Sequence, residues 1–371
     1  MQAFVHRLSM RHPGDVSSLD ALLAQERLAV ADIVAVIGKT EGNGGVNDFT
    51  RGYFTQSLMA LLARHGGEPA EALLRRIPCV LSGGCEGVLS PHYLVIGRRR
   101  AAASSRGPAL AVGVAMSEPV PPQDVGRAAH IASVAQTVRR AMADAALERP
   151  DQVHLVQLKV PALTMATLNP LRAAGLAPVS DDPNKAMALS RVAGAFGVAL
   201  ALGETTLDAE ALADAALRDF GCFSHRASVS SGVEVACNEV IVLGMSQAWQ
   251  GPLRIAHRAM ADALDAPAVH DVLDELGLLK GRLQPAAEDA ARVAGVLVKC
   301  EPDRRGHVRG QRHTMLDDTD INAQRHIRGA VGGLVAGLLG DGRVFVSGGA
   351  EHQGPDGGGL IAVIAAAEAL A

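Results

Sequence analysis

Short apolar runs that end in lysine occur three times along the chain, at residues 33–38 before Lys39, 153–158 before Lys159 and 293–298 before Lys299. Runs of this length, rich in β-branched residues, predict buried strands. Each is followed by a stretch with apolar residues three and four positions apart, over 53–72, 185–202 and 326–339, which predicts a helix. An arginine is expected at the start of each helix, and these three residues are Arg51, Arg191 and Arg328.

A second set of strands ends in serine. The pattern Ser-(Gly/Ser)-Gly-x-Glu begins at Ser82, Ser230 and Ser347, after the apolar segments 79–81, 227–229 and 344–346. A further strand is expected after each motif, at 92–97, 239–244 and 359–364. We also expect a helix to open each unit, most clearly over 123–148.

The order of lysine strand, arginine helix, serine strand and final strand therefore recurs three times. Such recurrence predicts an α/β protein of three homologous units around a pseudo-threefold axis, with the active site at the centre. We place the units at 1–103, 111–248 and 253–371. The junctions are expected in the Arg- and Ser-containing stretch 98–108 and the turn 247–252.

Composition narrows the class of protein. A chain of 371 residues with 48% hydrophobic but 3% aromatic residues suggests several closely packed units rather than one core of large rings. The net charge of −4 gives no reason to expect nucleic acid or an anionic membrane as partner. No apolar run approaches the ~20 residues that span a bilayer, and the N-terminus lacks the features of a signal peptide. The five cysteines contain no Cys-x-x-Cys pair, so the cytoplasm is the expected location.

The recurring residues suggest a chemistry. Serine needs a base to become a nucleophile, and lysine can serve only when burial and nearby positive charge lower its pKa. Three lysines and three arginines converging on one centre would need an anion or a strongly polar ligand. Glycines after the serine would let backbone N–H groups and the hydroxyl bind a carbonyl oxygen together. The simpler alternatives are solvated strand ends and ordinary turns, which the threefold recurrence disfavours, while the role of the motif glutamates stays open.

These lysines and serines, with the segments 47–51, 313–322 and 347–355, resemble the cyclic amide hydrolase family of cyanuric acid hydrolases and barbiturases. The resemblance covers essentially the whole chain. It implies three units around a central site and hydrolysis of cyanuric acid to carboxybiuret, which loses carbon dioxide to leave biuret. The runner-up activity opens barbituric acid to ureidomalonate, with the choice expected to rest on residues 320–328. A protein that binds small cyclic anions without reaction is the alternative of another class. A phosphate-ligand enzyme lacks the expected loop signature.

The resemblance also implies roles for individual residues. Ser230 would be the nucleophile and Lys159 its general base. The remaining members of the three sets would hold the substrate, and they are Lys39, Arg51, Ser82, Gly83, Arg191, Ser231, Lys299, Arg328, Ser347 and Gly348. In the third unit Arg325 is a rival to Arg328. Cys85 and Cys300 do not recur in the other units, so both are interpreted as bystanders rather than nucleophiles.

A structural Mg²⁺ or Ca²⁺ ion is the one cofactor the resemblance implies, and no organic cofactor is expected. The ligands would be the carboxylate of Glu301 and backbone carbonyls in a Gly-rich loop, those of Ala350, Gln353, Gly354, Pro355 and Gly358. Oxygen donors of this kind suit hard divalent ions, although a Gly-rich loop without metal is the simpler alternative. His352 is not expected to be a ligand. The family resemblance further implies a homotetramer.

Overall fold

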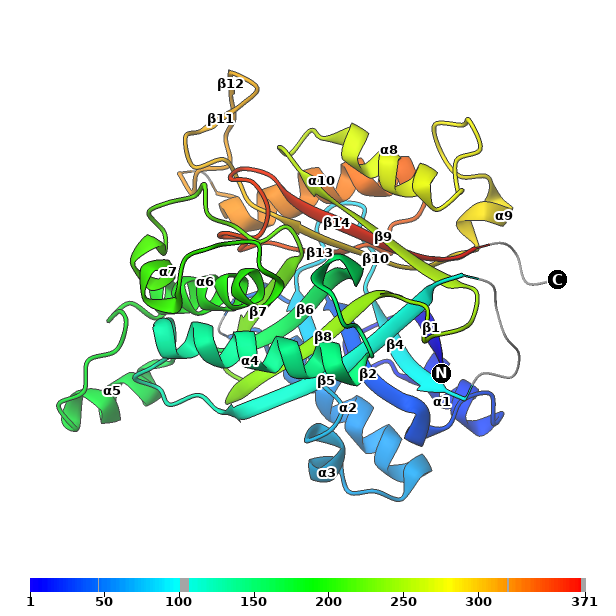
Figure 1. Ribbon diagram of the computed structural model, residues 1–371, viewed down its shortest axis with the longest axis horizontal. Helices are drawn as coiled ribbons and strands as arrows, with labels where there is room; N and C mark the ends of the chain where they lie inside the picture. Colours follow the sequence, from blue (N-terminus) through cyan, green and yellow to red (C-terminus); the bar gives the residue numbers. More distant parts are fainter. Residues whose placement is uncertain (46, 101–106, 319, 368–371) are drawn as a thin grey trace.

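The computed structural model describes residues 1–45, 47–100, 107–318 and 320–367. These residues form a mixed α/β fold built on three four-stranded sheets (Figure 1). The predicted unit boundary at residue 103 and Thr319 in the 313–322 motif lie outside the described residues.

The three sheets share one strand order. The first runs β1 (Gln2–Ser9), β4 (His92–Arg99), β2 (Ile33–Thr40), β3 (Cys79–Gly83). The second runs β5 (Ala109–Pro119), β8 (Cys237–Ser246), β6 (Val153–Pro161), β7 (Ala227–Gly232). The third runs β9 (Leu253–Met260), β14 (Gly359–Ala366), β10 (Val293–Cys300), β13 (Phe345–Ser347). A separate hairpin joins β11 (His307–Val308) to β12 (Gln311–Arg312).

Helices lie at the periphery of these sheets (Figure 1). Beside the first sheet are α1 (Ser17–Ala24), η1 (Val30–Asp32), α2 (Phe49–Gly66) and α3 (Ala70–Leu74). The second unit contributes α4 (Ala128–Asp144), η2 (Pro150–Gln152), α5 (Met165–Ala173), α6 (Pro183–Leu202) and α7 (Ala209–Ala215). The third contributes α8 (Ala266–Glu275), α9 (Ala287–Ala290) and α10 (Ala323–Leu339).

In every sheet the strand that carries the lysine is parallel to the strand that carries the serine. The register pairs Lys39 with Ser82, Lys159 with Ser230, and Lys299 with Ser347. One cluster of buried apolar side chains draws on all three sheets, including Ile37, Leu158 and Leu297. Parallel strands with equal register therefore bring three Lys–Ser pairs to the same depth around a shared core.

The predicted strands are confirmed, but each unit opens with a strand rather than a helix. β1, β5 and β9 precede α1, α4 and α8, and each pairs along its length with the unit's last strand. The helix predicted over 53–72 is two helices, because Gly67 with a φ of 70° ends α2 and Pro69 starts α3. The helix predicted over 123–148 is limited to α4.

The prediction that an arginine starts each helix is right for Arg51, which lies in the first turn of α2. It is wrong for Arg191 and Arg328, because Asp182 caps α6 and Asn322 caps α10 more than one turn before these residues. By length and composition α6 could cross a membrane, yet 67% of its apolar window is buried inside the protein. There it packs against α4 and β7, as a core helix does.

Candidate active site

A cavity of about 620 Å³ lies among the Lys–Ser strand ends of the three sheets. It is lined by nearly all of the predicted site residues, namely Arg51, Ser82, Gly83, Lys159, Arg191, Ser230, Ser231, Arg328, Ser347 and Gly348. Lys39 and Lys299 are fully buried and lie behind the serines of their own units. The fold thus gathers residues from the whole chain at one site.

The first and third units hold their serine in the same way. Lys39 Nζ donates to Ser82 Oγ at 3.1 Å and to the Gly83 carbonyl at 3.1 Å. Lys299 Nζ donates to Ser347 Oγ at 3.1 Å and to the Gly348 carbonyl at 2.8 Å. In both units the lysine Nζ binds the serine hydroxyl and the carbonyl of the following glycine together.

The second unit differs. Lys159 Nζ forms an ion pair of 2.8 Å with Glu234 instead of a hydrogen bond with its own serine. It also donates to the Leu81 carbonyl of the first sheet at 3.0 Å, just as Lys299 Nζ donates to the Val229 carbonyl of the second sheet at 2.7 Å. Ser230 is 7% exposed, and its hydroxyl has no hydrogen-bond partner among the described residues. The predicted catalytic pair is therefore adjacent in register, but Lys159 Nζ and Ser230 Oγ are not hydrogen-bonded to each other in this structure.

The glutamates of the three serine motifs form ion pairs with the three arginines, each across a unit boundary. Arg51 Nε donates to Glu234 at 3.0 Å, and Arg191 Nε donates to Glu351 at 2.8 Å. Arg328 closes the cycle through two contacts with the carboxylate of Glu86, at 3.0 and 2.6 Å. The sequence left the role of these glutamates open, although their threefold recurrence was the signal that could have revealed it.

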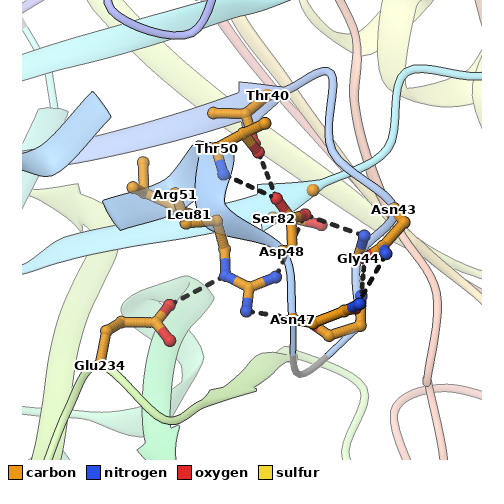
Figure 2. Close-up of polar contacts among 12 residues, drawn as sticks. Thr40, Asn43, Gly44, Asn47, Asp48, Thr50, Arg51, Leu81, Ser82 and Glu234 are labelled. Carbon is orange, nitrogen blue, oxygen red and sulfur yellow. Dashed lines mark hydrogen bonds and ion pairs between the residues drawn. The ribbon is translucent and has the colours of Figure 1, made fainter. Parts of the chain in front are cut away.

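The first of these arginines is held from two sides. Figure 2 shows the Arg51 guanidinium between Glu234 and the loop that precedes α2. On the loop side it contacts Asp48 at 3.3 Å and the Gly45 carbonyl at 3.1 Å. Asp48 also accepts from the N–H of Thr50 and so caps α2. The helix start and the arginine are thereby positioned by one carboxylate.

Glycine at the third motif position lets a cation approach the backbone. A Cβ on Gly84 would lie 2.7 Å from Arg328 Nη2, and one on Gly349 would lie 2.6 Å from Arg191 Nε. Both glycines have positive φ, of 96° and 64°. Neither position therefore accommodates a side chain without moving the arginine or straining the turn.

Burial tunes the two lysines behind the cavity. Desolvation, reinforced by Arg328, lowers the pKa of Lys39 to about 7. Desolvation, reinforced by Arg191, lowers the pKa of Lys299 to about 7. Both are therefore partly neutral near neutral pH.

In the second unit, burial and the ion pair between Lys159 and Glu234 shift the pKa values of these two residues in opposite directions. Desolvation lowers the pKa of Lys159, while its ion pair with Glu234 works in the opposite direction. Burial tends to raise the pKa of Glu234, but Lys159 and Arg51 outweigh it and lower that pKa to about 2. The ion pair with Glu234 therefore favours the protonated form of Lys159, whereas the described residues form no ion pair with Lys39 or Lys299.

Arg328, rather than Arg325, occupies the place that matches Arg51 and Arg191. Its side chain is buried and contacts Glu86 with two nitrogens, whereas the side chain of Arg325 is 51% exposed and lies 3.6 Å from Glu86. Both line the cavity.

Sequence reasoning did not identify the polar rim of the cavity. It consists of Asn43, Gly44, Gly45, Asn184, Asp317, Asn322 and Gln324. Gln324 accepts from the N–H of Gly349 at 2.7 Å and donates to Glu301 at 2.8 Å. It therefore links the third serine motif to the expected metal ligands, and its position one turn before Arg328 on α10 was the available signal.

Of the six expected metal ligands, Glu301, Ala350 and Gly354 line a small cavity of about 50 Å³, whereas Gln353, Pro355 and Gly358 are not among its lining residues. Among the described residues there is no cluster of three or more His, Cys, Asp or Glu side chains that could hold a metal. Ligation would therefore rest on one carboxylate and on backbone carbonyls. The carbonyls of Ala350, Pro355 and Gly358 each already accept one backbone hydrogen bond, which leaves each a second lone pair.

The carboxylate itself suits a cation. Burial, reinforced by Glu351, raises the pKa of Glu301 to about 7, although hydrogen bonds from the Ala350 N–H and the Gln324 amide act against the shift. A hard divalent cation would offset the free-energy cost of burying the ionised Glu301 carboxylate, so the residues fit the expected ion. His352 is not available as a ligand, since its ring contacts the Cys222 carbonyl and the Leu217 N–H.

The two cysteines near the cavity are poor nucleophiles. Burial raises the pKa of Cys85 to about 11 and that of Cys300 to about 12. Both thiols therefore stay protonated near neutral pH.

Comparison with known proteins gives a consistent result along the whole chain. A family model described as an amidohydrolase ring-opening protein matches residues 4–366. A cyanuric acid amidohydrolase from Azorhizobium caulinodans is 48% identical over 365 residues, which cover 98% of each chain. Another, from Methylobacterium sp. strain 4-46, is 50% identical over 368 residues, which cover 98% of this chain and 97% of the relative. A solved structure of a cyanuric acid hydrolase matches with a TM-score of 0.92 and 44% identity, covering 98% of this chain and 99% of that one. The chain belongs to the family of ring-opening amidohydrolases.

Proposed function

We propose that this protein hydrolyses cyanuric acid, opening the ring to carboxybiuret, which loses carbon dioxide to leave biuret. One observation carries the proposal: three Lys–Ser pairs, one from each sheet, and three arginines, one from each of α2, α6 and α10, surround a single polar cavity. Cyanuric acid has three equivalent carbonyl groups, so three equivalent binding sets match its symmetry. Relatives of this chain that bear the name cyanuric acid amidohydrolase support the same substrate.

We further propose that the three units are homologous and related by a pseudo-threefold axis through this cavity. Their equal strand order and the cyclic Arg–Glu ion pairs, from first to second to third and back to first, support this arrangement. The unit boundaries at 1–103, 111–248 and 253–371 remain predictions.

In the proposed reaction Ser230 Oγ attacks one ring carbonyl carbon while Lys159, in its neutral form, accepts the hydroxyl proton. The ring C–N bond then breaks, and the leaving nitrogen takes a proton from Lys159. Water hydrolyses the resulting acyl-serine and restores Ser230. Ser82 and Ser347, held by Lys39 and Lys299, would bind the other two carbonyls with the N–H groups of Gly83 and Gly348.

Ser230 is favoured as nucleophile because it is the unlike member of the three. The hydroxyls of Ser82 and Ser347 are already held by ammonium groups, which suits binding. Ser230 faces the same cavity with a hydroxyl that no described protein group engages. For the reaction, Lys159 would have to turn from Glu234 toward Ser230, its neighbour in register.

The three arginines would stabilise the ring as an anion. Arg51, Arg191 and Arg328 line the cavity, each oriented by the glutamate of another unit. Guanidinium groups held in this way present a fixed positive edge to a flat, anionic ligand.

Incubation with cyanuric acid and with barbituric acid, followed by loss of ring absorbance and by release of carbon dioxide, tests the proposal. We expect cyanuric acid to be consumed and biuret to accumulate. Opening of barbituric acid alone would instead indicate a barbiturase. Binding of either ring without turnover would indicate a protein that only holds cyclic anions.

We also propose a divalent cation, Mg²⁺ or Ca²⁺, held by Glu301 and the carbonyls of Ala350, Gln353, Gly354, Pro355 and Gly358. The ion would stiffen the loop that follows the third serine motif. Adding either ion to chelator-treated protein should raise the melting temperature, and Glu301→Gln should abolish that response.

A homotetramer and a cytoplasmic location are further proposals. All five cysteines are free, which is typical of a reducing compartment. Light scattering coupled to size-exclusion chromatography would measure the assembly directly.

A further inference from the structure

Each Ser–Lys pair extends across its sheet to a residue on a third strand. The antiparallel register places His92 beside Lys39, Glu239 beside Lys159, and Leu360 beside Lys299. Directly paired residues of neighbouring strands share one face of a sheet. Of the three rows, the second is therefore the one with a carboxylate behind its lysine, in the order Ser230, Lys159, Glu239.

Glu239 and Lys159 both form hydrogen bonds with strand β3 of the first sheet. The Glu239 side chain, in a residue only 9% exposed, accepts from the N–H of Cys79 at 3.0 Å. Two residues further along β3, the Leu81 carbonyl accepts from Lys159 Nζ at 3.0 Å. The next residue of that strand is Ser82, which lines the cavity. Two neighbouring side chains of the second sheet thus hold the strand that supplies a binding serine.

We propose that Glu239 is a positioning residue for Lys159. It completes the Ser230–Lys159–Glu239 row, anchors β3 of the first sheet and biases the charge state of the lysine. The inference rests on the proposed function insofar as Lys159 is the general base, but the register and the contacts do not depend on it.

The charged and titratable groups around Glu239 define the direction of this effect. Burial raises the pKa of Glu239 to about 7, with the Cys79 N–H and Lys159 acting against the shift and Glu234 adding to it. The other groups that face this cluster are the thiols of Cys79 and Cys237 and, through Lys159 and Glu234, the guanidinium of Arg51. An ionised Glu239 stabilises the protonated form of Lys159, whereas a protonated Glu239 does not.

Replacing the carboxylate should therefore make Lys159 lose its proton at lower pH. In Glu239→Gln an amide oxygen remains to accept from Cys79, but the negative charge is gone. We expect the acid limb of the kcat profile to move down by about one pH unit, with KM changed less than about threefold. Glu239→Asp, which keeps the charge, should retain the wild-type limb. His92→Gln, at the matching place behind Lys39, is the control and should not move it.

A second measurement does not require turnover. The rate of competitive acetylation of Lys159 against pH, followed by mass spectrometry, reports its pKa directly. We expect this pKa to fall in Glu239→Gln and to stay in Glu239→Asp. An unchanged Lys159 titration in a folded Glu239→Gln protein would overturn the proposal. If wild type opens neither ring yet the titration shifts, the proposed reaction fails and the role of Glu239 stands.

Discussion

The second Lys–Ser pair and its two counterparts show how one fold can build three similar sets and make one of them different. Lys39 and Lys299 hold their own serines and have no carboxylate in contact among the described residues. Lys159 is bound by Glu234, and Ser230 is left without a partner among those residues. The backbone register is the same in all three. The difference therefore comes from a few side chains, and it supports the proposal that two sets bind the substrate and one reacts.

The layer beneath the three pairs differs in the same unit. Two residues before each lysine and each serine, the first unit has Ile37 and Val80 and the third has Leu297 and Phe345. The second unit has Gln157 and Ser228, paired in register and almost completely buried. Neither side chain has a hydrogen-bond partner among the described residues. Such groups lower stability, and costs of this kind concentrate near functional sites.

The largest expected difference separates the three serines. Ser230→Ala should reduce kcat by about 10³-fold or more, because it removes the proposed nucleophile, with binding of cyanuric acid retained. Ser82→Ala and Ser347→Ala should act mainly on KM. Steady-state kinetics and titration calorimetry measure the two effects. A Ser230→Ala enzyme with wild-type turnover would move the nucleophile to one of the other two units.

The next difference concerns the three glutamates of the Arg–Glu cycle. Glu86→Gln and Glu351→Gln should lower kcat/KM about 10- to 100-fold through misplaced arginines, without changing the pH profile. Glu234→Gln should also shift the acid limb to lower pH, because Glu234 contacts Lys159 as well as Arg51. If the pH profiles of all three variants were identical, Glu234 would not influence the charge state of Lys159 during catalysis.

A smaller effect follows from the two lysines whose pKa is about 7 in the folded protein, against an ordinary value of 10.5. Between these values the unfolded chain binds more protons than the native one, so stability rises with pH across this window. Each lysine raises the unfolding free energy by at most about 1.4 kcal/mol for each pH unit in this window. Lys39→Met should flatten the dependence of the unfolding free energy on pH between 7 and 9. The exposed Lys185→Met variant should keep the wild-type slope.

The smallest effect is expected at Gln157, in the buried layer beneath Lys159 and Ser230. Gln157→Leu should raise the unfolding free energy by about 1–2 kcal/mol, since it replaces two unpaired polar atoms with the side chain present at the matching Leu297 position. The converse change, Leu297→Gln, should lower it by a similar amount or more. Denaturant unfolding measures both. If the Gln157→Leu protein were less stable than the wild type, the Gln157 amide would have hydrogen-bond partners in solution.

Much of the fold was predictable because its signals are local. Six-residue β-branched runs and the Ser-(Gly/Ser)-Gly-x-Glu motif each act over a few residues of chain. The break at Gly67 and Pro69 is equally local, but the prediction of one helix over 53–72 missed it. The strands that open each unit were missed because β1 and β9 are largely half-buried and lack a continuous apolar run. Repetition was the strongest signal for the site, because the same order of lysine, arginine and serine recurs three times although the loops between them differ in length.

The contacts between units were out of reach of the sequence. The recurrence of lysine, arginine and serine established which residues would meet. Which glutamate pairs with which arginine depends on how the three sheets pack, so Arg51 meets Glu234 rather than Glu86. The same packing brings Glu239 to the backbone of Cys79 and sets the burial that tunes each lysine. Local pattern specifies strands and turns, whereas charge state follows from desolvation and from neighbours far away in the chain.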